Sequence, residues 1–187
     1  MMSQAFVPQW ISRRQNTEAW EIFWVGSGTL YLALLAQISF SLPFTPVPIT
    51  GQTFGVATLA LLWGGKRTFA VVGIYLLEGA IGLPVFADFS GGLEWGPTLG
   101  YLIGMLLSGV FIGVFTDHGL TNTLLKAWLF CSLGSAFTFL IGLFILHFFI
   151  PFPDLLAAGL FPFLPGDILK NFAAALAVTK FRGRKPQ

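Results

Sequence analysis

The chain has 187 residues, of which 55% are hydrophobic and only 10% are charged. A water-soluble domain carries about a quarter charged residues, because its surface must be largely polar. The composition therefore predicts an integral membrane protein whose excess apolar surface contacts lipid. The net charge of +2 is too small to indicate a nucleic-acid partner, and the single cysteine, Cys131, excludes an intrachain disulfide.

The first 20 residues are expected to form a cytoplasmic N-terminal segment that is retained in the protein. Arg13 and Arg14 precede an apolar stretch, as in a signal peptide. That stretch is long enough to span a membrane, however, and it lacks a small-residue cleavage site. We therefore interpret it as the first transmembrane helix.

Six apolar segments follow one another along the chain, most of them near the length of about 20 residues that a spanning helix needs. They cover residues 22–42, 49–64, 68–83, 98–115, 127–150 and 167–179. Proline-rich or glycine-rich connections separate several of them, at 43–48, 84–97 and 151–166. We therefore predict an all-α integral membrane protein in which residues 1–187 form a single transmembrane domain with six helices.

The basic residues support an even number of helices. With six spans, nine of the ten Lys and Arg residues fall on one side of the membrane, including a basic tail at 180–187. The positive-inside rule makes this side cytoplasmic, so both termini are predicted to be cytoplasmic. The proline- and glycine-rich connections then lie on the non-cytoplasmic side.

Small residues recur at a spacing of four in the fourth segment, at Gly100, Gly104 and Ser108. Such stripes let two helices approach closely. Close packing within the chain is the main expectation, and a docking face for another membrane subunit is the alternative.

Lys170 is the basic residue that departs from the charge rule. It lies inside the last apolar segment, where a lysine costs about 2.5–3.5 kcal/mol on insertion scales and is usually functional. Asp167 is three residues earlier, so the two side chains share a helix face. In the structural alternative, Asp167 caps the helix and Lys170 pairs with it or reaches the interface. In the functional alternative, Lys170 meets a ligand anion and Asp167 accepts hydrogen bonds from ligand N–H groups.

Three further polar residues are candidate ligand contacts. Gln52 and Tyr101 begin the second and fourth apolar segments, so they are expected at the same membrane depth as Asp167 and Lys170. Glu78 is a tentative candidate inside the third segment, where an unpaired carboxylate is costly. For each of the three residues, helix packing or interface anchoring is the structural alternative.

The sequence contains no recognisable set of residues for catalysis, metal binding or ATP hydrolysis. The two histidines, His118 and His147, are predicted on opposite sides of the membrane and do not form a metal site. Gly65 and Lys66 lack the remainder of a phosphate-binding loop. We therefore expect no cofactor and no enzymatic activity. Two rival functions stay open: an intramembrane enzyme that uses Glu78 and Asp167 as a carboxylate pair, and a channel or scaffold without a ligand cavity.

Four strings in this sequence resemble the motifs of the BioY family, which comprises substrate-binding (S) components of energy-coupling-factor (ECF) biotin transporters. The strings are PFTPVPITGQT at 43–53, GLPVFA at 82–87, GPTLGYL at 96–102 and PGDILK at 165–170. They occur in the family's order and with its spacing. Three features depart from the pattern: Leu99 replaces a glycine, Glu78 an apolar residue, and Asp88 with Phe89 two small residues.

The resemblance implies a membrane-embedded S component of an ECF-type ABC transporter that captures biotin with high affinity near the outer face of the plasma membrane. The implied partners, besides membrane lipid, are a transmembrane coupling subunit and cytoplasmic ATPases. Asp167 and Lys170 are the binding residues that the family pattern transfers most directly, followed by Gln52 and Tyr101. Another small carboxylate vitamin is the alternative ligand. On the first helix, Thr29 and Ala33 fit the small-residue pattern expected for docking, whereas Gln37 does not.

Overall fold

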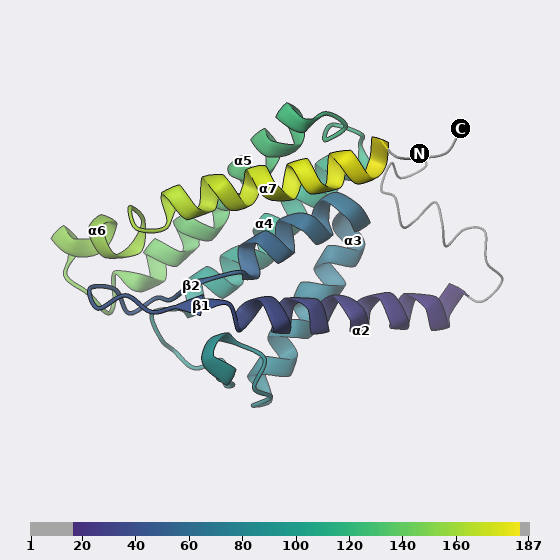
Figure 1. Ribbon diagram of the computed structural model, residues 1–187. Coiled ribbons are helices and arrows are strands. Elements are labelled where there is room, and N and C mark those ends of the chain that lie inside the picture. The colour runs from purple at the N-terminus through teal and green to yellow at the C-terminus, as the bar shows by residue number, and fades with distance from the viewer. Residues whose placement is uncertain (1–16, 184–187) are drawn as a thin grey trace.

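The protein is a bundle of long apolar helices with a small two-stranded hairpin at one end (Figure 1). The structure, a computed structural model, describes residues 17–183. The long helices are α2 (Thr17–Ala36), α3 (Gln52–Ala80), α4 (Leu99–Asp117), α5 (Leu124–Leu146) and α7 (Leu164–Gly183). The short elements are β1 (Ser39–Phe40), β2 (Ile49–Thr50), η1 (Ala87–Phe89), η2 (Phe152–Asp154) and α6 (Leu155–Gly159).

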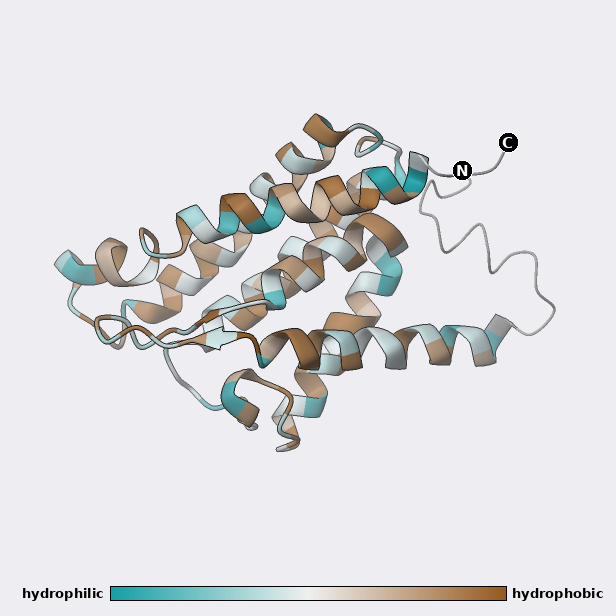
Figure 2. Ribbon diagram, viewed as in Figure 1, coloured by the Kyte–Doolittle hydropathy of each residue, from teal (hydrophilic) through white to brown (hydrophobic). Residues whose placement is uncertain are grey.

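The five long helices are long and apolar enough to cross a membrane, which confirms the prediction of a mostly helical membrane protein. Large apolar side chains remain exposed on their outer faces; Ile22, Leu30 and Leu140, for example, are 74%, 60% and 67% exposed. The helices are largely apolar, and hydrophilic residues gather toward helix ends and connections (Figure 2). This is the arrangement expected for a bundle surrounded by lipid.

The first helix ends earlier than predicted, at Ala36 instead of Leu42. Beyond it, β1 pairs with β2 in antiparallel register, with Ser39 opposite Thr50. Three prolines in the intervening 43–48 segment lack backbone N–H donors and prevent a helix there. The expectation that residues 37–42 are helical was therefore wrong, and the hairpin brings the proline-rich segment back to the start of α3.

The second and third predicted segments form the two helical arms of α3, which are joined by a bend at the non-helical residue Gly64. Gly64 has φ +78°, a conformation that glycine adopts without strain. The bend frees backbone groups that side chains then satisfy. The Gly65 N–H donates to Asp117 at 2.8 Å, and Arg182 donates to the Leu61 carbonyl oxygen. A side chain at Gly64 would collide with Asp117, since its Cβ would lie 2.1 Å from a carboxylate oxygen.

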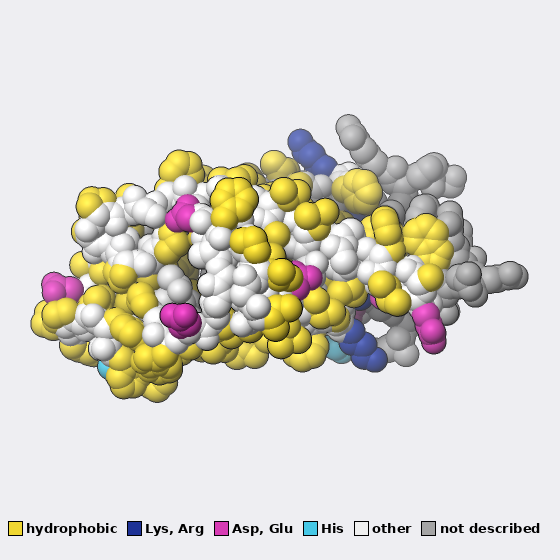
Figure 3. Space-filling model, turned by 90° about the horizontal axis from the view of Figure 1, so that it is seen from below, with side chains coloured by type: hydrophobic (Ala, Val, Ile, Leu, Met, Phe, Trp, Pro, Cys, Tyr) yellow, Lys and Arg dark blue, Asp and Glu magenta, His cyan; other side chains and the backbone are white. Residues whose placement is uncertain are grey.

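The beginning of α2, the end of α7 and the bend of α3 lie at one end of the molecule, whereas the hairpin and α6 lie at the other (Figure 1). On the face shown in Figure 3, the visible Lys and Arg side chains lie over the half that carries the beginning of α2 and the end of α7. An ion pair between Glu21 and Arg67 joins the beginning of α2 to the bend of α3. The molecule thus has a basic end and an end that holds the hairpin.

The small-residue stripe of α4 packs directly against α5, which confirms close packing within the chain. A Cβ atom at Gly100 would lie 2.4 Å from the Ile141 carbonyl oxygen, and one at Gly104 would lie 2.7 Å from the Thr138 Cα. Both neighbours are backbone atoms, so they cannot yield by changing a rotamer. The two helices therefore contact each other backbone to backbone.

We expect Gly100→Ala to lower the unfolding temperature of detergent-purified protein, because overpacking costs about 1–3 kcal/mol. Gly73→Ala is the matched control, since a Cβ there meets nothing within 4 Å. Its effect should be neutral or mildly stabilising. Thermal unfolding followed by tryptophan fluorescence measures both, and equal effects of the two substitutions would contradict the packing argument.

Candidate functional site

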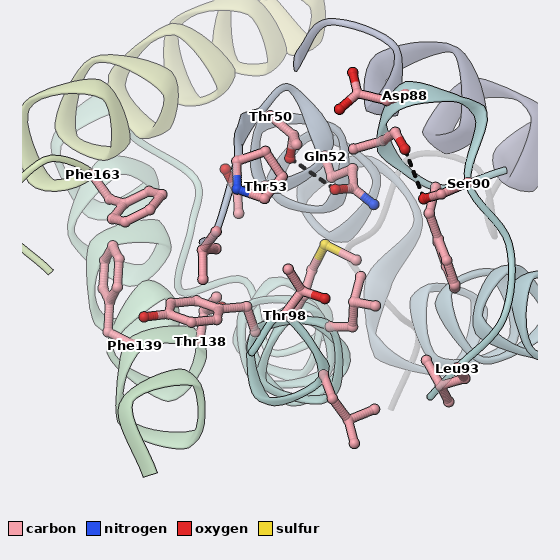
Figure 4. Close-up of a pocket in the computed structure, with 18 of the residues that line it drawn as sticks. Thr50, Gln52, Thr53, Asp88, Ser90, Leu93, Thr98, Thr138, Phe139 and Phe163 are labelled. Carbon is pink, nitrogen blue, oxygen red and sulfur yellow. Dashed lines mark hydrogen bonds between the residues drawn. The ribbon is translucent and has the colours of Figure 1, made fainter. Parts of the chain in front are cut away.

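A cavity of about 330 Å³ lies at the hairpin end of the bundle. This volume is at the lower end of the range of about 300–1,000 Å³ for small-molecule sites. Its wall is built from the beginnings of α3, α4 and α7, the middle of α5, the proline-rich segment and the connection between α3 and α4. In Figure 4, Thr50, Gln52 and Thr53 lie on one side of the cavity and the rings of Phe139 and Phe163 on another. The cavity therefore offers both polar and aromatic surfaces.

Asp167 lies in the first turn of α7 and lines the cavity, with its side chain buried. One carboxylate oxygen accepts a hydrogen bond from the Ser135 hydroxyl at 3.0 Å, and the other accepts from the Asn171 amide at 2.9 Å. Asn171 also donates to the Ser135 hydroxyl at 2.9 Å. The carboxylate is thus held from two sides by buried donors, and it does not cap the helix. A carboxylate has about four acceptor sites, so this arrangement leaves capacity for a ligand.

Lys170 is half-buried and also lines the cavity. Its ammonium group donates to the Thr50 carbonyl oxygen at 3.0 Å and to the Thr53 hydroxyl at 2.7 Å. Within residues 17–183, no ion pair joins Lys170 to Asp167. The lysine is therefore held by hydrogen bonds to β2 and α3, and not by an ion pair with its neighbour. It links α7 to the beginning of α3 beside the cavity, and an ammonium group has one further donor for a ligand.

Gln52 is buried at the first position of α3 and lines the cavity. Its amide donates to the Tyr75 hydroxyl at 2.6 Å and accepts from the Thr50 hydroxyl at 2.8 Å. Tyr75 in turn donates to the Val85 carbonyl oxygen at 2.9 Å. These bonds tie the two arms of α3 to the connection that follows, so Gln52 shapes the cavity wall through its neighbours.

Tyr101 lines the cavity from the first turn of α4. Its hydroxyl donates to the Gly159 carbonyl oxygen in α6 at 2.7 Å, and its ring lies 6.0 Å from that of Phe163. The structure therefore brings Gln52, Tyr101, Asp167 and Lys170 together at one cavity.

Glu78, the remaining candidate, does not line this cavity. Because Glu78 is absent from the lining, Glu78 and Asp167 do not face each other across this cavity as a carboxylate pair.

The family profile of BioY matches residues 10–187 of this chain. The chain belongs to the BioY family. It is 35% identical over 163 residues to the protein named biotin transporter BioY from Thermotoga maritima, covering 84% of this chain and 94% of that protein. It is 36% identical over 159 residues to the probable biotin transporter BioY from Pyrococcus horikoshii, covering 82% and 93%.

A solved structure supports the same assignment to BioY. The fold matches the crystal structure described as the S-component for biotin from an ECF-type ABC transporter, with a TM-score of 0.82 and 28% sequence identity. The match covers 92% of this chain and 95% of the solved chain. Membership of BioY, together with the apolar helices, makes this chain a multi-pass protein of the plasma membrane that serves transport and is not an enzyme.

Several residues of this BioY chain that hydrogen-bond to the site residues were not predicted from the sequence. They are Ser135, Asn171, Thr50, Thr53 and Tyr75. The role of Asn171 could have been predicted from the sequence, since it follows Asp167 by four residues and shares its helix face. Ser135 and Tyr75 belong to other helices inside apolar runs, and no spacing rule connects them to Asp167 or Gln52.

Proposed function

We propose that this chain binds biotin in the cavity at the hairpin end and serves as the S component of an ECF-type ABC transporter. The observation that carries the proposal is the cavity with Asp167 and Lys170 in its wall, within a fold matched by a biotin S-component. An intramembrane enzyme is disfavoured because Glu78 lies outside this cavity. A channel or scaffold without a ligand cavity is disfavoured by the cavity itself.

The chemistry of biotin suits the lining of the cavity. Its ureido ring offers two N–H donors and a carbonyl acceptor, its bicycle is apolar, and its alkyl tail ends in a carboxylate. Asp167 supplies an acceptor for the N–H groups, and the aromatic rings of Phe139 and Phe163 supply apolar surface. The proline-rich segment contributes Val47 and Pro48 to the wall, and we propose that it closes over the ligand.

The spacing of the two charged residues suggests which part of biotin they meet. Residues three apart on a helix have Cβ atoms about 5–6 Å apart. The biotin carboxylate is separated from the ureido ring by the whole alkyl tail. Two side chains this close together therefore fit the same end of the ligand better than opposite ends of it. We therefore propose that Asp167 accepts from a ureido N–H and that Lys170 donates to the ureido carbonyl oxygen. This differs from the sequence-based expectation that Lys170 meets a ligand anion.

We further propose six membrane crossings, with the two arms of α3 counted separately on either side of Gly64. The described basic residues other than Lys170 lie at the bend of α3 or near helix ends: Lys66, Arg67, Lys126, Lys180 and Arg182. Their grouping supports a cytoplasmic location for that end. Residues 1–16 and 184–187 lie outside the described residues, so the cytoplasmic segments at 1–20 and 180–187 stay predictions. A coupling subunit and ATPases are the proposed partners, and the chain is proposed to act as a single substrate-binding domain.

A thermal-shift comparison of detergent-purified protein with different vitamins tests the ligand. Biotin at about 100 times its dissociation constant should stabilise the fold by about 2.7 kcal/mol, because it binds the folded state only. That corresponds to a rise of about 5–10 °C in unfolding temperature for a chain of this size. Riboflavin, thiamine and pantothenate serve as controls. A shift with one of them but none with biotin would overturn the choice of ligand.

A further inference from the structure

One wall of the cavity is an irregular loop, residues 85–94, between α3 and α4. We call it the wall loop. Apart from the three residues of η1, it has no helix or strand of its own. Most of its residues line the cavity: Phe86, Ala87, Asp88, Ser90, Gly92, Leu93 and Glu94. Figure 4 shows Asp88, Ser90 and Leu93 along one side of the cavity, so the position of this loop determines how closed the cavity is.

The wall loop has a strained backbone at its apex. Asp88 and Phe89 have φ values of 56° and 55°, in the left-handed region that residues other than glycine rarely adopt. Two such residues in succession persist only where surrounding contacts hold them. Both side chains are exposed, so their own packing does not supply those contacts.

The two ends of the wall loop are fixed to α3. The Tyr75 hydroxyl donates to the Val85 carbonyl oxygen at 2.9 Å, and the Phe86 ring packs against Tyr75 with the ring centroids 5.4 Å apart. At the other end, the Gly92 N–H donates to the Gly79 carbonyl oxygen at 2.7 Å. These contacts anchor the base of the loop. Within the loop, the Ser90 N–H and hydroxyl donate to the Ala87 carbonyl oxygen at 3.1 and 2.7 Å, and the Phe86 N–H donates to the Ser90 carbonyl oxygen at 3.0 Å. These internal bonds close the apex turn on itself but do not attach it to a helix.

The apex is held by the side chain of Gln37, immediately after α2. The Gln37 amide nitrogen donates to the Phe86 carbonyl oxygen at 3.0 Å, and the amide oxygen accepts from the Phe89 N–H at 3.0 Å. The same nitrogen donates to the Ala33 carbonyl oxygen at 3.1 Å, which ties the amide to the last turn of α2. One side chain thus binds the backbone on both sides of Asp88. This accounts for a glutamine at a position where the docking pattern of the helix favours a small residue.

We propose that Gln37 is a positioning residue that holds the wall loop closed over the ligand and thereby controls how fast the ligand leaves. The inference rests on the proposed function, in that the cavity is taken to bind biotin. When the amide is removed, the strained apex loses its external hold and the loop opens more often. Loops of this kind commonly set rates of ligand exchange. The base of the loop stays anchored to α3, so the rest of the fold is unaffected.

Gln37→Met tests the inference, because methionine has a similar length but neither hydrogen-bonding group. Leu34→Met is the matched control on α2, since Leu34 is 62% exposed and outside the cavity lining. We expect radiolabelled biotin to dissociate about tenfold faster from Gln37→Met than from wild type, a difference of about 1.4 kcal/mol. Amide hydrogen exchange of the ligand-free protein should accelerate in residues 85–94 and not in the long helices.

Gln37→Glu provides a second variant, which keeps the acceptor for the Phe89 N–H and loses the donor to Phe86. Its dissociation rate should lie between wild type and Gln37→Met. An unchanged dissociation rate in Gln37→Met, or an equal increase in Leu34→Met, would overturn the inference. If wild type itself does not bind biotin, the proposed function fails instead, and exchange in the wall loop still tests the role of Gln37 without any ligand.

Discussion

Asp167→Asn is expected to weaken biotin binding by about a hundredfold, or about 2.7 kcal/mol. The carboxylate accepts one hydrogen bond on each oxygen, from Ser135 and from Asn171, and still has acceptor capacity directed at the cavity. Asparagine has only one oxygen. If its NH₂ group replaces the oxygen that faces Asn171, it opposes a donor, which is unfavourable for a buried group. If the NH₂ group replaces the oxygen that faces Ser135, it can donate to that hydroxyl, but this side no longer accepts a hydrogen bond from a ureido N–H of the ligand.

Equilibrium binding of radiolabelled biotin to purified protein measures this effect. Asp154→Asn is the matched control, because Asp154 is exposed in η2 and does not line the cavity. Its affinity should equal that of wild type. If Asp167→Asn retained wild-type affinity while remaining folded, Asp167 would have only a structural role.

Most of the helical architecture could be predicted from hydropathy, since a spanning helix must be apolar over a length that the membrane sets. The boundaries of the helices were harder to predict from the sequence. Residues 37–42 are as apolar as many helical segments, yet they leave the helix because β1 pairs with β2. The bend at Gly64 likewise depends on Asp117 and Arg182, which are distant in sequence. Asp117 accepts from the freed Gly65 N–H, and Arg182 donates to the freed Leu61 carbonyl oxygen. Contacts of this kind leave no periodic signal in the sequence.

The candidate site, like the fold, could be predicted from the sequence only in part. Asp167 and Lys170 could be predicted because a charged residue in an apolar helix is costly and therefore conspicuous. Glu78 was conspicuous for the same reason, but hydropathy does not specify which way a side chain points, and it lies outside the cavity. The supporting residues Ser135 and Tyr75 are compatible with any buried helix. Their role depends on packing between helices, which a single sequence does not reveal.

Lys170→Met is expected to reduce biotin affinity by about ten- to a hundredfold, since a hydrogen bond to a charged group contributes about 1.5–3 kcal/mol. The substitution also removes the bonds to Thr50 and Thr53 that join α7 to the beginning of α3. Thr53→Val separates the two effects. It deletes one of those internal bonds and leaves the ammonium group in place, so it should weaken binding much less than Lys170→Met.

Biotin amide, in which the tail carboxylate is neutral, distinguishes the two possible partners of Lys170. If the lysine donates to the ureido carbonyl oxygen, Lys170→Met should lower the affinities for biotin and for biotin amide by the same factor, because the ureido ring is common to both. If it paired with the tail carboxylate, wild type would prefer biotin and the variant would lose that preference. Competition with radiolabelled biotin gives all four affinities. A preference that disappears in Lys170→Met would show that the two charged residues of α7 bind opposite ends of the ligand, contrary to the arrangement proposed from their spacing of one helical turn.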